Sequence, residues 1–316
     1  MADILAERTG ANARLDLNHI EVVVNPASGG VGPGATEQMQ ALLDEAGRDA
    51  NVIEAGPDDL EDCLKAALDS EPDLLILLAG DGTARAAASM AGAKGPLLAP
   101  LAGGTMNMLP YAIYGRRPWQ EALTDILEDG IEKEIGGGQV GEHAFFVAAI
   151  LGAPALWAHA REAVRKRDLR EAVERARYAW SRAFSSKISF QVEGEPRRRA
   201  EALTLLCPLV SRAMSETEQA LEIDGLDPGG AAEAFRLGFR ALMSEFIGDW
   251  RDDPAVTARK ATSARAWASG RIPAIFDGEP TRLPKDVAIR YVPCAFRALA
   301  PRPAEPEPDP DPAVEP

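Results

Sequence analysis

Acidic residues set among glycines are the side chains best suited to chemistry in this sequence. Gly80-Asp81-Gly82-Thr83 places one carboxylate between two flexible residues, directly after an apolar run. A carboxylate contributes little to packing there, but beside a nucleotide its charge could be balanced by magnesium or by water bound to it. The alternative is that Asp81 and Thr83 cap the helix that follows. This tetrapeptide alone supports the two interpretations equally.

Two further glycine-rich segments, 25–34 and 103–107, also follow apolar runs. Glycines at the start of a helix let backbone N–H groups approach an anion, and phosphate is the natural ligand for such a turn. A P-loop is excluded because segment 29–34 has no lysine. The dinucleotide fingerprint GxGxxG is missed as well, since the glycines fall at 29, 30, 32 and 34, although Glu54 lies at a suitable distance.

The elements that must position these loops alternate in type. Apolar runs at 20–24, 74–78 and 97–101 each lead into a glycine loop, and a helix is predicted from an N-cap at Thr36 to Gly47. Fully apolar strands that alternate with helices indicate an α/β fold, with a parallel sheet covered on both faces. Ligands bind at the carboxyl ends of such strands, so all three loops should lie at one edge.

From about residue 136 the pattern changes to short β-like runs separated by turns. These runs are 144–150, 188–192, 202–207, 264–268, 274–276 and 287–291. They predict a mostly β second domain, interrupted by a helix over 169–184. The predicted organisation is a flexible leader (1–19), an α/β nucleotide-binding domain (20–134), a β-rich domain (135–300) and a disordered tail rich in proline and acids (301–316).

Composition restricts the function further. The 316 residues are 46% hydrophobic and 26% charged, and no apolar run approaches the length of a membrane span. The three cysteines lack zinc-like spacing and predict reduced thiols in the cytoplasm. A net charge of −15 argues against nucleic acid as a partner.

Five motifs taken together resemble the diacylglycerol kinase catalytic family, which includes bacterial lipid kinases and sphingosine kinases. They occur in order from about residue 20 to 300, and five in register are specific where one would not be. The motifs are Asn25-Pro-Ala-Ser-Gly-Gly, Ala79-Gly-Asp-Gly-Thr, Pro100-Leu-Ala-Gly-Gly-Thr-Met-Asn, Asp224-Gly-Leu-Asp and Asp277-Gly-Glu-Pro.

The resemblance implies a two-domain kinase of the NAD kinase and diacylglycerol kinase fold, with ATP in the cleft between an α/β domain and a β-sandwich domain. The γ-phosphate would pass to a lipid hydroxyl with the help of magnesium. By the same resemblance Glu279 is the proton acceptor, Asp277 helps to hold the nucleotide and metal, and Asp81 serves the phosphates and magnesium-bound water. The implied nucleotide contacts are Asn25, Ser28, Gly29, Gly80, Asp81, Gly82, Thr83, Gly104, Thr105 and Asn107.

Two of these implied sites have plainer alternatives. Asp224 with the carbonyls of Leu221 and Leu226 would bind a second, structural magnesium ion, whereas an Asp-Gly turn without metal explains the same letters. Asp277-Gly278-Glu279 would be a catalytic turn, whereas an ordinary hairpin with a solvated glutamate has the same sequence.

The sequence also departs from the family pattern. Ala79 replaces a glycine, Arg85-Ala86 replaces an Asn-Glu pair, Met106 replaces a small residue, and Met108 replaces an aspartate. We expect Arg85, near a helix start, to supply a cation to the phosphates. The methionines predict a drier site with altered ATP binding or substrate choice.

A lipid kinase must meet its substrate at a bilayer. The basic segment 157–187, with 9 Lys and Arg against 4 Asp and Glu, is a candidate contact for an anionic membrane, which would give a cytoplasmic protein a peripheral place at the inner membrane surface. Alternatively, its apolar stripe packs on the second domain.

Two other functions stay open: an NAD kinase-like enzyme, and a non-catalytic lipid- or nucleotide-binding protein.

Overall fold

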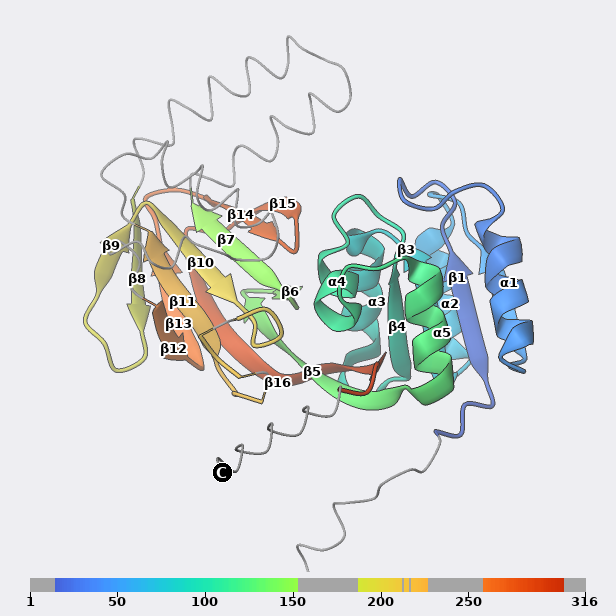
Figure 1. The fold of residues 1–316 in the computed structure, drawn as a ribbon. Helices are drawn as coiled ribbons and strands as arrows, with labels where there is room; N and C mark the ends of the chain where they lie inside the picture. The colour runs from blue at the N-terminus through green and yellow to red at the C-terminus, as the bar shows by residue number, and fades with distance from the viewer. Residues whose placement is uncertain (1–14, 153–186, 212, 216, 227–257, 304–316) are drawn as a thin grey trace, which may run out of the picture.

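The computed structural model describes residues 15–152, 187–211, 213–215, 217–226 and 258–303. Two lobes lie side by side and are joined by long strands (Figure 1). The predicted helix over 169–184, nearly all of the basic segment 157–187, and most of the leader and tail lie outside the described residues. No helix within the described ranges is long and apolar enough to cross a membrane.

The N-terminal lobe is a parallel sheet with helices on both faces (Figure 1). Its strands run in the order β2-β1-β3-β4, and β1 pairs in parallel with both β2 and β3. Every residue of β1 and β3 is buried, which is why these strands read as continuous apolar runs. The elements are β1 (Ile20–Val24), α1 (Ala35–Glu45), β2 (Ala50–Glu54), α2 (Leu60–Asp69), β3 (Leu74–Ala79), α3 (Asp81–Ala91), a 3₁₀ turn (Gly92–Lys94), β4 (Leu97–Ala102), α4 (Met108–Tyr114) and α5 (Trp119–Asp129).

The C-terminal lobe is built from two antiparallel layers, and their facing side chains form a second core. One layer has the order β12-β11-β10-β7-β14-β15, and the other contains β16-β13-β8-β9. The strands are β5 (Ile131–Val140), β6 (His143–Phe145), β7 (Ala148–Gly152), β8 (Ile188–Val192), β9 (Arg198–Ala200), β10 (Ala202–Leu206), β11 (Leu221–Leu226), β12 (Ala258–Ala261), β13 (Ser263–Trp267), β14 (Ile272–Phe276), β15 (Glu279–Leu283) and β16 (Asp286–Ala300). The α/β fold with a second, sandwich-like β domain is confirmed.

Strands β5 and β16 belong to both lobes. They pair antiparallel over their lengths, with a register shift between Val292 and Phe296, and Ala298 of β16 also pairs in parallel with Leu98 of β4. The predicted domain boundary at 134/135 falls inside β5. The lobes are therefore connected by a two-stranded ribbon, and this ribbon fixes how the loops of one lobe face the other.

Several predicted boundaries are wrong in detail. Helix α1 begins at Ala35 after Gly34, whose φ of 76° is left-handed, whereas Thr36 lies inside the helix and donates a hydrogen bond to Glu54 at 2.7 Å. The predicted run 144–150 is two strands, β6 and β7, separated by residues that hydrogen-bond to another segment. The run 287–291 is only the start of the 15-residue strand β16.

Candidate active site

The three glycine loops meet at the carboxyl edge of the parallel sheet, as the strand order requires. The backbone N–H of Gly30 donates to the carbonyl of Gly103 at 2.9 Å, and the N–H of Gly103 donates to that of Ala79 at 3.2 Å. A methyl group added at Gly104 would lie 2.9 Å from Cα of Gly80. The loops thus pack backbone against backbone, which only glycine permits at this separation.

Asparagine side chains brace two of these loops from within. Asn107 is 6% exposed with a φ of 53°, and its amide both accepts from the N–H of Gly104 at 2.6 Å and donates to its carbonyl at 3.0 Å. Asn25 is 9% exposed and accepts a hydrogen bond from the N–H of Ala27 at 3.0 Å. The Asn107 amide and the Oδ1 atom of Asn25 therefore help to hold their loops in shape.

The side chains of Ser28 and Thr105 lie at the contacts between loops. Methyl groups added at Gly80 and Gly29 would lie 3.2 Å from the hydroxyls of Ser28 and Thr105, respectively. Thr105 and Gly29 are exposed, while Thr83, in the first turn of α3, is partly buried. This group of loop residues can present hydroxyl and N–H groups to an anion.

Asp81 caps a helix, but a different helix from the one expected. It is the first residue of α3, whose cap makes no side-chain hydrogen bond, and its Oδ1 accepts from the N–H of Leu109 in α4 at 3.3 Å. Because β3 and β4 are neighbours, the loops that follow them are close enough for this bond. Burial raises the pKa of Asp81, the backbone N–H groups of residues 107–109 lower it, and the charge of Glu279 raises it.

Glu279 reaches this loop from the other lobe. It begins β15, directly after the turn at 277–278, and its side chain is exposed. A methyl group added at Gly82 would lie 3.7 Å from Oε1 of Glu279. Two carboxylates that are distant in the sequence, those of Asp81 and Glu279, therefore share one site between the lobes.

Asp277 lies two residues before Glu279 in the sequence, but it is buried where Glu279 is exposed. It is 2% exposed, and its carboxylate accepts three backbone hydrogen bonds, from Phe146 at 2.8 Å and from Val147 and Ala148 at 2.9 Å. Burial raises its pKa to about 6, against the lowering effect of these three donors and of the charge of Arg85. Its oxygens face the β6–β7 connection, so the geometry makes Asp277 an anchor for the turn.

Arg85 lies one helical turn beyond Asp81 in α3 and is partly buried. Its positive charge lowers the pKa of Asp277. The sequence-based expectation placed Arg85 at the phosphates.

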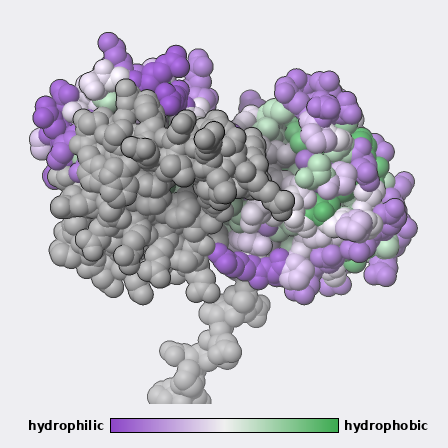
Figure 2. All heavy atoms as spheres, turned by 90° about the horizontal axis from the view of Figure 1, so that it is seen from above, coloured by the Kyte–Doolittle hydropathy of each residue, from purple (hydrophilic) through white to green (hydrophobic). Residues whose placement is uncertain are grey.

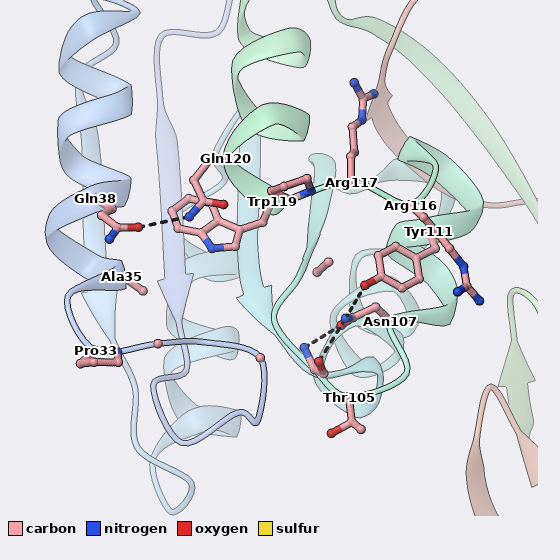
Figure 3. Close-up of a pocket in the computed structure, with 15 residues that line it drawn as sticks. Pro33, Ala35, Gln38, Thr105, Asn107, Tyr111, Arg116, Arg117, Trp119 and Gln120 are labelled. Atoms are coloured by element: carbon pink, nitrogen blue, oxygen red, sulfur yellow. Dashed lines mark hydrogen bonds between the residues drawn. The ribbon is translucent and has the colours of Figure 1, made fainter. Parts of the chain in front are cut away.

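A hollow of about 730 Å³ lies beside the same loops (Figure 3). Gly104, Thr105 and Asn107 line one side and Trp119 and Gln120 the other, and Gln120 bonds Gln38 at 3.2 Å. Arg116 and Arg117 also line the hollow, whereas Asp81 and Glu279 do not. The sequence reasoning did not predict this hollow, because α5, which contributes Trp119 and Gln120, carries no motif.

The structure contradicts the ligands predicted for the second metal site, which were Asp224 and the carbonyls of Leu221 and Leu226. Leu221 and Leu226 are the two ends of strand β11. At a rise of about 3.3 Å per residue their carbonyls lie roughly 16 Å apart, far too distant for one cation with oxygen ligands at about 2.0–2.6 Å. Asp224 itself is fully buried in β11. Among the described residues, no group of three or more His, Cys, Asp or Glu side chains could hold a metal ion.

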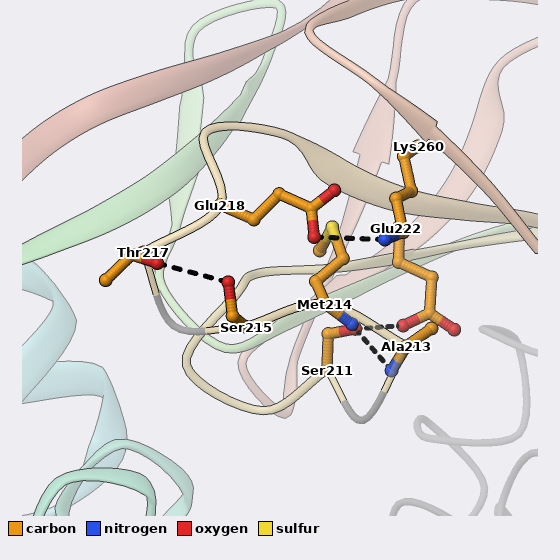
Figure 4. A network of polar contacts seen from close by, with 8 residues as sticks. All are labelled: Ser211, Ala213, Met214, Ser215, Thr217, Glu218, Glu222 and Lys260. Carbon is orange, nitrogen blue, oxygen red and sulfur yellow. Dashed lines mark hydrogen bonds and ion pairs between the residues drawn. The ribbon is translucent and has the colours of Figure 1, made fainter.

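The surroundings of β11 form a polar network instead (Figure 4). Glu222, also fully buried, accepts a hydrogen bond from the hydroxyl of Ser211, which in turn accepts from the N–H groups of Ala213 and Met214 at 3.2 and 3.1 Å. These bonds hold the connection between β10 and β11 on the strand.

The three loops and the two lobes have the arrangement that the sequence predicted. Residues 19–140 match the family model of the diacylglycerol kinase catalytic domain. This confirms the resemblance found in the sequence. A kinase of this family implies ATP and usually a divalent metal.

Solved structures share the fold across nearly the whole chain. A diacylglycerol kinase from Bacillus anthracis str. Sterne aligns with a TM-score of 0.66 at 16% identity, covering 91% of this chain and 98% of that one. A second structure from the same strain aligns with the same TM-score at 17% identity, covering 92% and 98%. No curated protein matches the sequence.

Proposed function

We propose that this protein is an ATP- and magnesium-dependent lipid kinase that transfers the γ-phosphate to a hydroxyl of diacylglycerol or a related lipid. The observation that carries this proposal is the meeting of Glu279 from one lobe with Gly82 beside Asp81 of the other. The catalytic domain match supports the reaction class, and the proposal adds the acceptor and the residue roles.

The chain's residues fit ATP as a substrate. Ser28, Gly29, Gly80 and Thr105 lie where the loops touch, and Gly82 and Thr83 lie in the first turn of α3. Their N–H and hydroxyl groups are of the kind that binds phosphate. Asn25, Gly104 and Asn107 keep these loops in place. A divalent metal would be held near Asp81, where it would neutralise phosphate charge.

Glu279 is suited to general base catalysis. Its exposed carboxylate can accept the proton of the lipid hydroxyl while the lipid oxygen bonds to the γ-phosphorus and the bond from that phosphorus to the bridging oxygen breaks. ADP leaves, and the proton departs from Glu279 to water afterwards. In this proposal Asp277 holds the turn in place through its hydrogen bonds to the backbone of residues 146–148.

The test is transfer of labelled γ-phosphate from ATP to a panel of detergent-dispersed lipids and to NAD. We expect one lipid class to be labelled, and Glu279→Gln to lower kcat by roughly 100-fold or more, the loss typical of a missing general base. Asp81→Asn should abolish labelling too, whereas Glu45→Gln, an exposed change on α1, should leave the rate unchanged. Labelling of NAD alone would make the protein an NAD kinase, and ATP binding without any turnover would favour a binding protein.

Arg85 is proposed to serve the ATP phosphates from α3, a role that its position beside the turn still permits. Arg85→Ala should weaken ATP binding by roughly 10-fold, since a charge-assisted contact contributes about 1.5 kcal/mol. An unchanged ATP affinity in isothermal titration would assign Arg85 to the turn alone.

A transient anionic membrane surface is proposed as the partner that supplies the lipid. The N-terminal lobe is mostly hydrophilic where it is seen in Figure 2. It is also strongly acidic, since residues 15–152 hold 7 Lys and Arg against 22 Asp and Glu. Residues 187–211, 213–215, 217–226 and 258–303 together hold 13 Lys and Arg against 9 Asp and Glu, so the C-terminal lobe is better suited to approach anionic lipid.

A further inference from the structure

Two methionines of the N-terminal lobe lie against the turn that carries Glu279. A methyl group built on Gly278 would lie 3.3 Å from Sδ and 3.5 Å from Cε of Met106, and 3.6 Å from Sδ of Met108. Met106 comes from the loop after β4 and Met108 begins α4, whereas Gly278 belongs to the β14–β15 turn. The thioethers therefore pack across the boundary between the lobes.

The turn is constrained from both sides. Both of its residues are left-handed, with φ values of 47° at Asp277 and 90° at Gly278. On the side of the C-terminal lobe the Asp277 carboxylate is held by three N–H groups. On the other side lie Met106, partly buried, and Met108, 5% exposed. Glu279, the next residue, is directed to Gly82 by this arrangement.

We propose that Met106 and Met108 are positioning residues that hold the Glu279 turn against the Gly80–Thr83 loop, so that the base is aligned before substrates bind. The catalytic consequence rests on the proposed function, while the packing does not. Methionine suits the task because its flexible thioether fills an irregular gap and makes no demand for hydrogen bonds beside a charged site. Preset alignment matters because small displacements of a reacting group are costly to the rate.

The first experiment measures hydrogen exchange by mass spectrometry on the full chain without ligands. We expect Met106→Ala to speed exchange in peptides covering 272–283 by roughly threefold to tenfold, because removing the packing partner makes local opening easier. Met106→Leu, which retains apolar volume, should restore slow exchange. Met90→Ala is the matched control, since Met90 on α3 is 39% exposed.

Unchanged exchange over 272–283 in Met106→Ala would overturn the proposal. An equal increase in β1 peptides would overturn it too, because that result indicates general loosening of the N-terminal lobe. Neither outcome depends on kinase activity, so a failure of the proposed function leaves this test intact.

The second experiment is kinetic. In Met106→Ala we expect kcat for lipid phosphorylation to fall roughly 10-fold while KM for ATP changes less than about twofold, and Met106→Leu to recover most of the rate. A raised KM for ATP with unchanged kcat would mean that Met106 contacts the nucleotide, and the positioning role would be wrong.

Discussion

At the scale of single residues, the carboxylates of Asp277 and Glu279 differ in how deeply they are buried. Glu279 is exposed and free to approach a substrate, whereas Asp277, two positions earlier, is almost fully buried and accepts three N–H bonds. The sequence shows both as acids flanking a glycine, and only the β6–β7 connection, about 130 residues away, distinguishes them. Asp277 should therefore affect the stability of the turn more directly than the chemistry.

Replacing Asp277 by asparagine tests this assignment. The amide nitrogen of Asp277→Asn would face an N–H donor where an oxygen now accepts, and the unsatisfied contact should lower the free energy of unfolding by about 1–3 kcal/mol. Urea unfolding measures the loss. Glu279→Gln, at the exposed side of the same turn, is the control and should change stability by less than about 0.5 kcal/mol. Equal stability of the two variants would contradict an anchoring role for Asp277.

The raised pKa of Asp277 leads us to expect that the stability of the protein depends on pH. Its pKa is about 6 in the folded protein against an ordinary 3.8, because burial disfavours the charged form. As pH rises from about 4 to about 6, the unfolded chain therefore loses this proton first, and the free energy of unfolding falls by at most on the order of 3 kcal/mol. Above about pH 6 this contribution is constant. Unfolding measured at several pH values should show a smaller decline in Asp277→Asn than in the unmodified protein, and parallel curves would refute the assignment.

At the scale of elements, the site depends on how closely three strand-to-helix connections approach each other. A methyl group at Gly103 would lie 2.7 Å from the backbone nitrogen of Ala79 and 2.8 Å from Cγ2 of Val31. At Gly32, in the first loop, it would meet no atom within 4 Å. The close contact therefore belongs to particular glycines and is not a general property of glycine-rich segments.

Gly103→Ala should consequently disturb the loops, and Gly32→Ala should not. We expect Gly103→Ala to destabilise the N-terminal lobe by about 1–3 kcal/mol through overpacking, with weaker ATP binding because the first and third loops separate. Thermal unfolding and ATP titration of both variants provide the measurement. If Gly32→Ala is equally destabilising, the contact between loops does not explain the glycines.

The sequence predicts the loops well and the contacts between lobes poorly. Buried parallel strands are apolar throughout, so the sequence predicts β1, β3 and β4 and the loops that follow them. The apolar-run pattern does not predict β2, which has a mixed burial pattern, or the ribbon strand β5, since neither is a continuous apolar run. The contact of Met106 with Gly278 leaves no local pattern, because it depends on the folding of β16 into both lobes.

At the scale of the whole molecule, the two lobes that β5 and β16 connect differ in charge: residues 15–152 are strongly acidic, whereas the described residues from 187 onward hold a small excess of Lys and Arg. The C-terminal layer β16-β13-β8-β9 carries arginines around one tryptophan: Arg197 lies 4.6 Å and Arg265 5.9 Å from the ring of Trp267. Arg265 is also paired with Asp286 at 2.7 Å, which leaves exposed Arg197 as the more available charge. If the protein takes its substrate from an anionic bilayer, this lobe should meet the lipid while the acidic lobe stays away.

Vesicle binding tests that orientation. We expect the protein to sediment with vesicles containing anionic lipid and not with neutral ones, with binding that weakens as salt increases. Arg197→Glu should lower the partition coefficient roughly 10-fold or more, because each basic residue near the surface contributes about 1 kcal/mol and the reversal adds repulsion. Lys65→Glu makes the same charge change on α2 of the acidic lobe and should have little effect. Equal losses in the two variants would show that net charge alone governs binding, and binding that ignores lipid charge would remove the membrane from the proposed function.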